Sequence, residues 1–465
     1  MKKKILVVVA NSYPFYCSIA KHIELDHLEM DDHVEVFNYE KLFGGWPYTF
    51  SIKEKIYNFL FSRNFSKLFK NSNIVNFKYN SNHKYEYPDT VSNLIKFRIE
   101  NINIGLATLT SSVMMSGIPN PIKCNEMGRA FYKAFDDSLM ALDIAKKIFL
   151  KKYDKVYIWN GRLSFTRPIF EYLSNKIEIN IFETGRDRLH FMLYDNFPQN
   201  NHYISTLIEK HTSNNLENDA KKFFEGRRNR IEDYDDAHAR IQTAGKGIAI
   251  DKNKKMIVYF TSSESERTGL FDNNNIGNFK NQMNVVQNIY NFMDKEKYFL
   301  VVKFHPGQGK HHTIWKQLWD FDFLDKKRIL YLLPESNVDT YTVIDQSYCV
   351  ITCGSTVGIE AVYWNKKCIN IGNSRYMTLS SSINVKNEKE LQNALLNIDN
   401  AKINRQGAIK YGSFHTNLGK RVRNLNLDDN KLYKYNDKYF NYYSLFKVKL
   451  KKYLYGKKNQ STESN

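Results

Sequence analysis

The chain has 465 residues, a formal net charge of +19 at pH 7 and 42% hydrophobic residues. This length exceeds that of an ordinary single domain, and the composition is that of a folded protein rather than a disordered one. The apolar run at residues 5–10 is too short for a signal-peptide core or a membrane span, and no other window reaches the length of a transmembrane helix. We therefore expect a cytoplasmic protein that contacts a membrane, if any, only peripherally at its inner face.

The positive charge suits a polyanionic partner such as nucleic acid, an anionic membrane or a phosphorylated substrate, although a Lys- and Asn-rich composition explains it equally well. The excess of basic residues is strongest over residues 431–465, which hold nine Lys and nine Tyr or Phe but only two acidic residues. Such a segment either lies on an anionic membrane or packs its aromatic side chains on the domains while its lysines face water. The five Cys residues are scattered, so neither disulfides nor a structural metal are expected.

The first half of the chain opens as strand, helix and strand within residues 1–40 and is irregular over about 45–130. The spacing of apolar residues then predicts further elements, which are a helix at 131–152, a strand at 154–159, a helix at 167–173 and a strand at 178–182. Strands that alternate with helices in this way are typical of a doubly wound parallel sheet. Ligands of such sheets bind at the carboxyl ends of the strands.

The second half repeats this alternation after a charged stretch at about 210–250. Its predicted strands are 256–263, 298–304, 328–334, 348–353 and 367–372, and its predicted helices are 281–293, 341–346 and 357–364. We therefore predict an α/β protein with two Rossmann-like, doubly wound domains that face a central cleft. The predicted boundaries are 1–250 for the N-terminal domain, 251–430 for the C-terminal domain and 431–465 for the basic aromatic segment.

The segment VITCGSTVGIEAVYW, at residues 350–364, carries the clearest signal for chemistry. An apolar strand breaks into Gly354, Ser355 and Thr356 and continues as a helix. Backbone N–H groups at a helix N-terminus attract phosphate, and Glu360, one turn further on, is placed to reach a ribose hydroxyl. A plain helix start with Ser or Thr as N-cap would satisfy the same letters.

A second motif, KFHPG at residues 303–307, ends another predicted strand of the same half. Pro306 ends the strand, so His305 lies at the carboxyl end of the sheet beside the same crevice. An imidazole there can donate a hydrogen bond to a phosphate or to a donor sugar. Lys303 is grouped with these donor-binding candidates.

The HPGQ motif, the segment from Val338 to Tyr376 and the upstream WNGR together resemble the bacterial capsule polysaccharide biosynthesis glycosyltransferases. That broad family has the GT-B architecture and includes Kdo transferases that use a CMP-activated sugar. The resemblance implies donor binding by His305, Ser355, Thr356 and Glu360, and it extends best over about residues 300–376. It does not fix the sugar or the nucleotide, which we expect to be CMP, UDP or GDP.

The acceptor-side groups of a GT-B enzyme come from the N-terminal half. Polar residues follow two predicted strands there, namely Asn160, Gly161, Arg162, Glu183, Arg186 and Asp187. Glu183 is the candidate general base or nucleophile, because a carboxylate can accept the proton of an acceptor hydroxyl or attack the anomeric carbon. Arg162 and Arg186 are candidates to offset the leaving phosphate or bind an acidic sugar. For Asp187, a surface salt bridge is the preferred interpretation.

Other signals favour no cofactor and no metal. The first strand is followed by ANSYPFYCS rather than by G-x-G-x-x-G, which disfavours a dinucleotide cofactor. The pair His311–His312 has no acidic or Cys neighbour, and Asp235, Asp236 and His238 lie in a charged linker. The loop at 262–267 either lines the donor site or is solvated.

These observations predict a metal-independent glycosyltransferase that moves a sugar from a nucleotide-activated donor to a glycan or glycolipid of a surface polysaccharide. A teichoic-acid-type polyol-phosphate transferase and a nucleotide-sugar 2-epimerase share the architecture and remain alternatives. A non-enzymatic alternative is a protein that binds polyanions or membranes through its charge, although no nucleic-acid-binding motif supports it.

Overall fold

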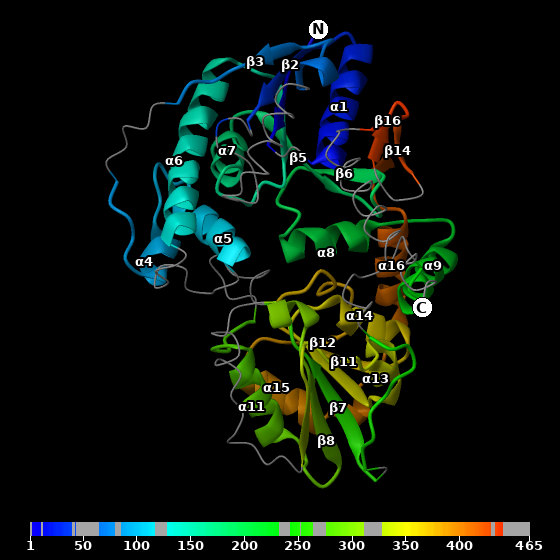
Figure 1. The fold of residues 1–465 in the computed structure, drawn as a ribbon. Helices are drawn as coiled ribbons and strands as arrows, with labels where there is room; N and C mark the ends of the chain where they lie inside the picture. The colour runs from blue at the N-terminus through cyan, green and yellow to red at the C-terminus, as the bar shows by residue number, and fades with distance from the viewer. Residues whose placement is uncertain are drawn as a thin grey trace, which may run out of the picture.

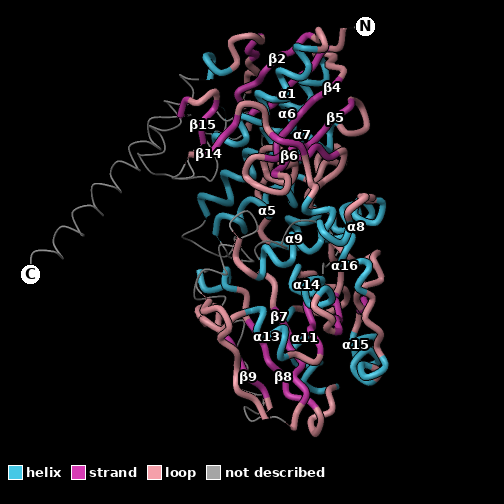
Figure 2. The backbone as a smooth tube through the Cα atoms, turned by 90° about the vertical axis from the view of Figure 1, so that its right-hand side faces the viewer, coloured by secondary structure: helices cyan, strands magenta, loops and turns pink. Residues whose placement is uncertain are grey.

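The computed structural model describes residues 2–10, 13–39, 42, 65–79, 85–116, 128–231, 242–251, 253–263, 276–310, 328–428 and 433–439. Predictions for residues 235–238, 264–267, 311–312 and 440–465 lie outside this part of the chain. Two α/β lobes are stacked end to end, the N-terminal half in one and most of the C-terminal half in the other (Figure 1). Seen from the side, the sheets of the two lobes remain separate, with helices between them (Figure 2).

The first lobe contains a seven-stranded sheet with the order β13-β6-β5-β4-β1-β2-β3. Its strands are β1 (Lys4–Val9), β2 (His33–Asn38), β3 (Asn73–Val75), β4 (Lys155–Trp159), β5 (Glu178–Thr184), β6 (His190–Tyr194) and β13 (Lys420–Arg421). The strands from β3 to β5 pair in parallel, whereas β6 and β13 pair antiparallel at one edge. The apolar run at 5–10 is fully buried in this sheet, which explains its continuous hydrophobicity.

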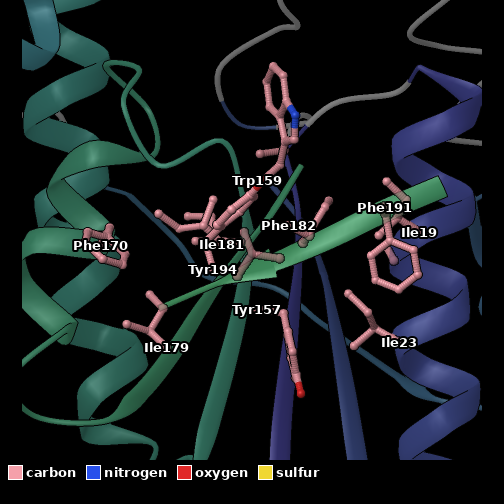
Figure 3. Packing of buried hydrophobic residues seen from close by; sticks show 14 of the residues in the cluster. Ile19, Ile23, Tyr157, Trp159, Phe170, Ile179, Ile181, Phe182, Phe191 and Tyr194 are labelled. Carbon is pink, nitrogen blue, oxygen red and sulfur yellow. The ribbon is translucent and has the colours of Figure 1, made fainter. Parts of the chain in front are cut away.

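The helices of the first lobe cover the sheet and extend toward the second lobe. They are α1 (Pro14–Glu29), α4 (Val91–Lys96), α5 (Ile104–Ser116), α6 (Gly128–Leu150), α7 (Arg167–Leu173), α8 (Asn201–Lys210) and α9 (Leu216–Arg228). Side chains of α1 and α7 meet those of the central strands in one apolar core, while Trp159 stands at the carboxyl end of β4 (Figure 3). The irregular stretch predicted at 45–130 contains β3, α4 and α5 in its described part.

The second lobe contains a six-stranded sheet with the order β12-β11-β10-β7-β8-β9, in which every pairing is parallel. Its strands are β7 (Lys255–Phe260), β8 (Tyr298–Lys303), β9 (Ile329–Leu332), β10 (Cys349–Thr352), β11 (Lys367–Ile371) and β12 (Ile383–Val385). Its helices are α11 (Gln282–Phe292), α13 (Thr340–Gln346), α14 (Thr356–Tyr363), α15 (Glu388–Leu396) and the short 3-10 turns at 306–310 and 398–400. The predicted alternation of strands and helices is confirmed in both halves.

The chain then returns to the first lobe. Helix α16 (Arg405–Thr416) packs against α9, and β13 joins the edge of the first sheet beside β6. A small antiparallel sheet of β14 (Leu425–Leu427), β15 (Tyr433–Tyr435) and β16 (Lys438–Tyr439) follows beside α1. The predicted C-terminal domain, 251–430, therefore includes a segment whose partners are largely in the first lobe.

The fold is a pair of Rossmann-like domains with their strand ends turned toward a shared cavity, as predicted. Within the described ranges, none of the helices combines the length and hydrophobicity needed to cross a bilayer. The Cys residues of those ranges are free thiols, all buried. Burial raises the pKa of the Cys349 thiol to about 12, so this thiol behaves as an apolar group.

Candidate functional site

A cavity of about 950 Å³ lies between the strand ends of the two sheets. Both lobes contribute to its wall, together with the end of α9 and the return helix α16. The lining residues used below are Tyr16, Trp159, Asn160, Arg162, Glu183, Tyr194, Arg227, His305, Gly354, Ser355, Thr356, Arg375 and His415. The two motifs read from the second half of the sequence therefore meet in one place, opposite the polar residues of the first half.

The turn between β10 and α14 has the geometry of a close backbone approach. Gly354 has φ +71°, and a Cβ atom there would lie 2.5 Å from the backbone oxygen of Asn373. Only glycine fits such a position without displacing the neighbouring loop. Ser355 is the N-cap of α14, and its hydroxyl accepts a hydrogen bond from the Val357 N–H at 3.4 Å. The predicted N-cap is confirmed, and this helix start borders the cavity; whether it binds an anion stays a prediction.

His305 lies across from this turn, at the end of β8. Its Nδ1 accepts a hydrogen bond from the Gly307 N–H at 3.1 Å. The neutral ring must then carry its proton on Nε2, which makes Nε2 a donor. The backbone N–H of His305 donates to the Thr261 hydroxyl at 2.8 Å and to Gln308 Oε1 at 3.1 Å, and these bonds fix the backbone that carries the ring.

Lys303 and Glu360 lie in a second, smaller cavity of about 100 Å³, which shares His305, Ser355 and Thr356 with the first. Glu360 is buried, and its carboxylate accepts hydrogen bonds from Arg227 Nε at 3.2 Å and from the Tyr341 hydroxyl at 2.5 Å. Lys303 donates to the Val338 carbonyl at 3.1 Å, and burial lowers its pKa to about 8. Both groups border the cavity at the end of the second sheet, and both already have protein partners.

Glu183, at the end of β5, faces the cavity from the first lobe. Asn160 Nδ2 donates to its Oε1 at 2.5 Å, and the Thr184 N–H donates to its Oε2 at 3.3 Å. The pKa of Glu183 is nevertheless raised, because the surrounding protein withdraws it from water and this outweighs Asn160 and the charge of Arg162. A carboxylate with a raised pKa that borders a cavity is suited to proton transfer.

The turn after β4 fixes the residues beside Glu183. Asn160 and Gly161 both adopt the left-handed conformation, with φ +64° and +76°. A Cβ atom on Gly161 would lie 2.4 Å from Ile181 Cδ1, so the turn packs directly on β5. This contact brings Asn160 to the carboxylate and places Arg162 at the cavity wall.

Arg186 is directed elsewhere, contrary to the expectation that it binds substrate. Its guanidinium meets His190 Nε2 at 2.8 Å and donates to the Thr416 carbonyl at 3.3 Å, and it pairs with Asp187 at 3.5 Å. The reason is the return of the chain, because the turn that follows β5 is filled by the end of α16. Asp187 also binds His190 Nδ1, at 2.6 Å, which agrees with its interpretation as a structural residue.

Several cavity residues have no signal in the sequence. Arg375 follows β11 and donates to the Pro198 carbonyl at 3.4 Å, while Arg227 lies at the end of α9 and pairs with Glu360. Arg162 also lines the described wall, so that even with Arg227 offset by Glu360 the wall holds two further guanidinium groups, Arg162 and Arg375, and one carboxylate, Glu183. The cavity therefore favours an anionic ligand.

His415, on α16, also lines the cavity. Its ring stacks on Phe223 at 5.4 Å between centroids, and burial lowers its pKa to about 3. The imidazole is therefore neutral over the whole range in which the protein would work. Within the described ranges, no group of three His, Cys, Asp or Glu side chains is placed to hold a metal ion.

Comparisons with known proteins identify no family. No protein-family model matches the chain, and no curated protein matches it significantly. Among solved structures, the β-Kdo 2,4 transferase KpsC of Thermosulfurimonas dismutans is 13% identical over 58% of this chain and 85% of its own, with a TM-score of 0.37. The UDP-GlcNAc 2-epimerase of Methanocaldococcus jannaschii is 15% identical over 90% of this chain and 98% of its own, with a TM-score of 0.30. Similarity at this level assigns neither a reaction nor a substrate to the chain.

Proposed function

We propose that the protein transfers a sugar from a nucleotide-activated donor to a glycan or glycolipid of a bacterial surface polysaccharide. One observation carries the proposal. His305 and the Gly354–Thr356 turn line the same cavity, and Glu183 faces them from the other lobe. The groups that we propose to bind phosphate and to accept a proton thus border one space large enough for a nucleotide sugar.

On the donor side, the leaving group is a nucleotide phosphate. The Nε2–H of His305 and the N-terminus of α14 both favour the charge that develops on the phosphate oxygen as the bond to the sugar breaks. Arg375 adds positive charge to the same wall, whereas the charge of Arg227 is offset by Glu360. This arrangement supports departure of the nucleotide by means of protein groups alone, and metal independence remains part of the proposal.

On the acceptor side, Glu183 is the proposed general base. It takes the proton of an acceptor hydroxyl, the hydroxyl oxygen bonds to the anomeric carbon, and the electrons of the broken carbon–oxygen bond remain on the phosphate. Asn160 holds the carboxylate through the hydrogen bond to Oε1, and this favours a single orientation toward the cavity. Direct attack of Glu183 on the anomeric carbon is the retaining variant of the same proposal.

The proposal includes CMP, UDP or GDP as the nucleotide and peripheral contact with the inner membrane face through the basic C-terminal segment. Its first test is thermal unfolding of the full chain with each nucleotide, since a ligand at 100 times its Kd stabilises the folded state by about 2.7 kcal/mol. One nucleotide should raise Tm in the wild type, and the rise should be clearly smaller in a His305→Ala variant. A protein that no nucleotide stabilises would contradict the proposal.

A second assay separates the proposed transferase from its alternatives. The stabilising nucleotide is supplied as its sugar donor, with and without a membrane glycan extract, and the products are identified. Transfer that requires the extract supports the proposal, whereas an epimerised donor without acceptor indicates the epimerase. Transfer of a polyol phosphate would indicate the teichoic-acid-type alternative.

A further inference from the structure

A row of aromatic rings leads out of the cavity along the first lobe. Trp159 and Tyr16 both line the cavity, and their ring centroids are 4.8 Å apart. The Tyr13 ring follows at 6.1 Å from Tyr16, and the Tyr433 ring at 5.6 Å from Tyr13. The row thus connects the end of β4 with the start of α1 and with β15, three segments far apart in the sequence.

The rings differ in exposure along this row. Trp159 is only 6% exposed, Tyr433 is 9% exposed, and Tyr13 is 48% exposed. Tyr13 thus presents a ring to solvent just outside the cavity while it contacts the half-buried Tyr16 ring on one side and the buried Tyr433 ring on the other. An exposed tyrosine that is supported in this way is a preformed surface, because little side-chain freedom remains to be lost when a ligand stacks on it.

The row also has a polar side that faces the proposed base. The Tyr16 hydroxyl lies beside Thr184 and Trp159, and burial together with the charge of Glu183 raises its pKa to about 12. Tyr16 is thus a neutral hydroxyl donor next to the carboxylate. A flat apolar face with hydroxyl groups at its edge matches a sugar ring, which has C–H bonds on its faces and hydroxyl groups around its rim.

We propose that Tyr16 and Tyr13 form two successive binding positions for the sugar residues of an oligosaccharide acceptor. The residue that receives the new sugar stacks on Tyr16, with its reacting hydroxyl toward Glu183, and the preceding residue stacks on Tyr13. This inference rests on the proposed function and names its acceptor class as a glycan of at least two sugar residues. A lipid chain fits the row less well, since the hydroxyl edge and the nearby Asn160 and Arg162 offer polar groups that a lipid tail cannot use.

The experiment uses the full chain with the nucleotide found by thermal unfolding and measures retention on an array of bacterial oligosaccharides and single sugars. We expect the wild type to retain a set of oligosaccharides. Tyr13→Ala should weaken binding of these by about threefold to tenfold, the range of a single aromatic contact, and leave single sugars unaffected. Tyr16→Leu should weaken binding of both kinds.

Tyr132→Ala is the matched control. Tyr132 is also 48% exposed and also contacts a neighbouring ring, Tyr87 at 4.7 Å, but it lies on α6 at the opposite flank of the lobe from α1 (Figure 1). The Tyr132→Ala variant should bind every oligosaccharide and every single sugar as the wild type does. Equal loss in Tyr132→Ala and Tyr13→Ala, or a wild type that retains no oligosaccharide, would overturn the inference.

The nucleotide-induced rise in Tm should be the same in Tyr13→Ala as in the wild type. A protein stabilised by a nucleotide but without glycan binding would refute the acceptor inference alone. A protein that binds glycans but that no nucleotide stabilises would instead refute the proposed transferase. The two ideas therefore fail by different measurements.

Discussion

The two walls of the cavity are built in different ways. In the second lobe, the site consists of two short stretches, His305 with its turn and Gly354 to Thr356, each held by hydrogen bonds within a few residues or to neighbouring strands. In the first lobe, the base Glu183 is contributed by β5, its partner Asn160 by β4 and its aromatic neighbour Tyr16 by α1. One wall is local and depends on backbone geometry, whereas the other is assembled from distant side chains.

This difference predicts different responses to mutation. Changes in the local wall should act on the backbone that surrounds the phosphate, and should therefore affect nucleotide binding. Changes in the assembled wall should leave nucleotide binding intact and affect the transfer step. The predictions below test this division.

Glu183→Gln should have the largest effect. The amide keeps the shape of the side chain but cannot accept a proton, so kcat for transfer should fall by about 10²–10⁴-fold, the range of general-base catalysis. The nucleotide-induced rise in Tm should be unchanged. The rate of nucleotide release in the presence of acceptor measures the effect.

Glu178→Gln, at the opposite end of the same strand and paired with Lys155, is the control for this substitution. It should retain wild-type activity. Because the raised pKa of Glu183 requires a higher pH for its ionisation, wild-type activity should already fall on acidification at a pH where an ordinary Glu is still ionised. A Glu183→Gln variant with normal kcat would show that Glu183 is not the general base.

Gly354→Ala should have the second-largest effect. The added Cβ would lie 2.5 Å from the Asn373 oxygen at a positive φ, and strain of this kind costs about 1–3 kcal/mol. Because the loop must move, the nucleotide should no longer raise Tm. Gly245→Ala is the matched control, since Gly245 has φ +76° but no heavy atom within 4 Å of its Cβ position. If both variants lose nucleotide binding equally, contact with Asn373 is not the cause.

His305→Ala should weaken nucleotide binding by about tenfold, which corresponds to one hydrogen bond to a charged group. Titration calorimetry with the stabilising nucleotide measures the change. His202→Ala, an exposed histidine on α8, should bind like the wild type. Equal affinity in the His305→Ala variant would show that the ring does not contact the phosphate.

His415 should produce the smallest effect, visible only in stability. Its pKa is about 3 in the folded protein, so the unfolded chain binds a proton below its ordinary pKa of about 6.5 while the folded chain does not. Stability from this residue is therefore present above about pH 6.5 and is lost as the pH falls, by roughly 1–2 kcal/mol at pH 5. Denaturant titrations at pH 7 and pH 5 measure the free energy of unfolding, which should fall less in His415→Phe than in the wild type. An equal fall in both proteins would refute the lowered pKa of His415.

The local wall is also the part that the sequence makes predictable. One strand is followed by Gly-Ser-Thr and another by His-Pro, and each turn is determined by consecutive residues. Because strands alternate with helices, the sheet is parallel, and both turns are expected at the same edge of it. Asn160 and Glu183 could be found in the same way, because Asn160 follows β4 and Glu183 lies in the last residues of β5.

The residues that reach the cavity through contacts between the lobes, and the assembled wall of the first lobe, could be predicted only in part. Arg375 is a single basic residue in a loop, and its place at the cavity depends on the α8 side of the first lobe through Pro198. Arg186 has the same charge and also follows a strand, yet the return of α16 turns it away from the cavity. The return strand β13 spans only Lys420–Arg421, too short for any periodic pattern. Contacts between segments so far apart in the sequence leave no local sequence pattern from which they could be predicted.

The central claim is that His305 and the α14 N-terminus hold the same leaving phosphate. A crystal structure of the protein with the stabilising nucleotide tests it most directly. The account predicts a phosphate oxygen within hydrogen-bonding distance of His305 Nε2 and of the Ser355–Thr356 turn, with Glu183 across the cavity. A phosphate bound outside this cavity, or held by the first lobe alone, would contradict it.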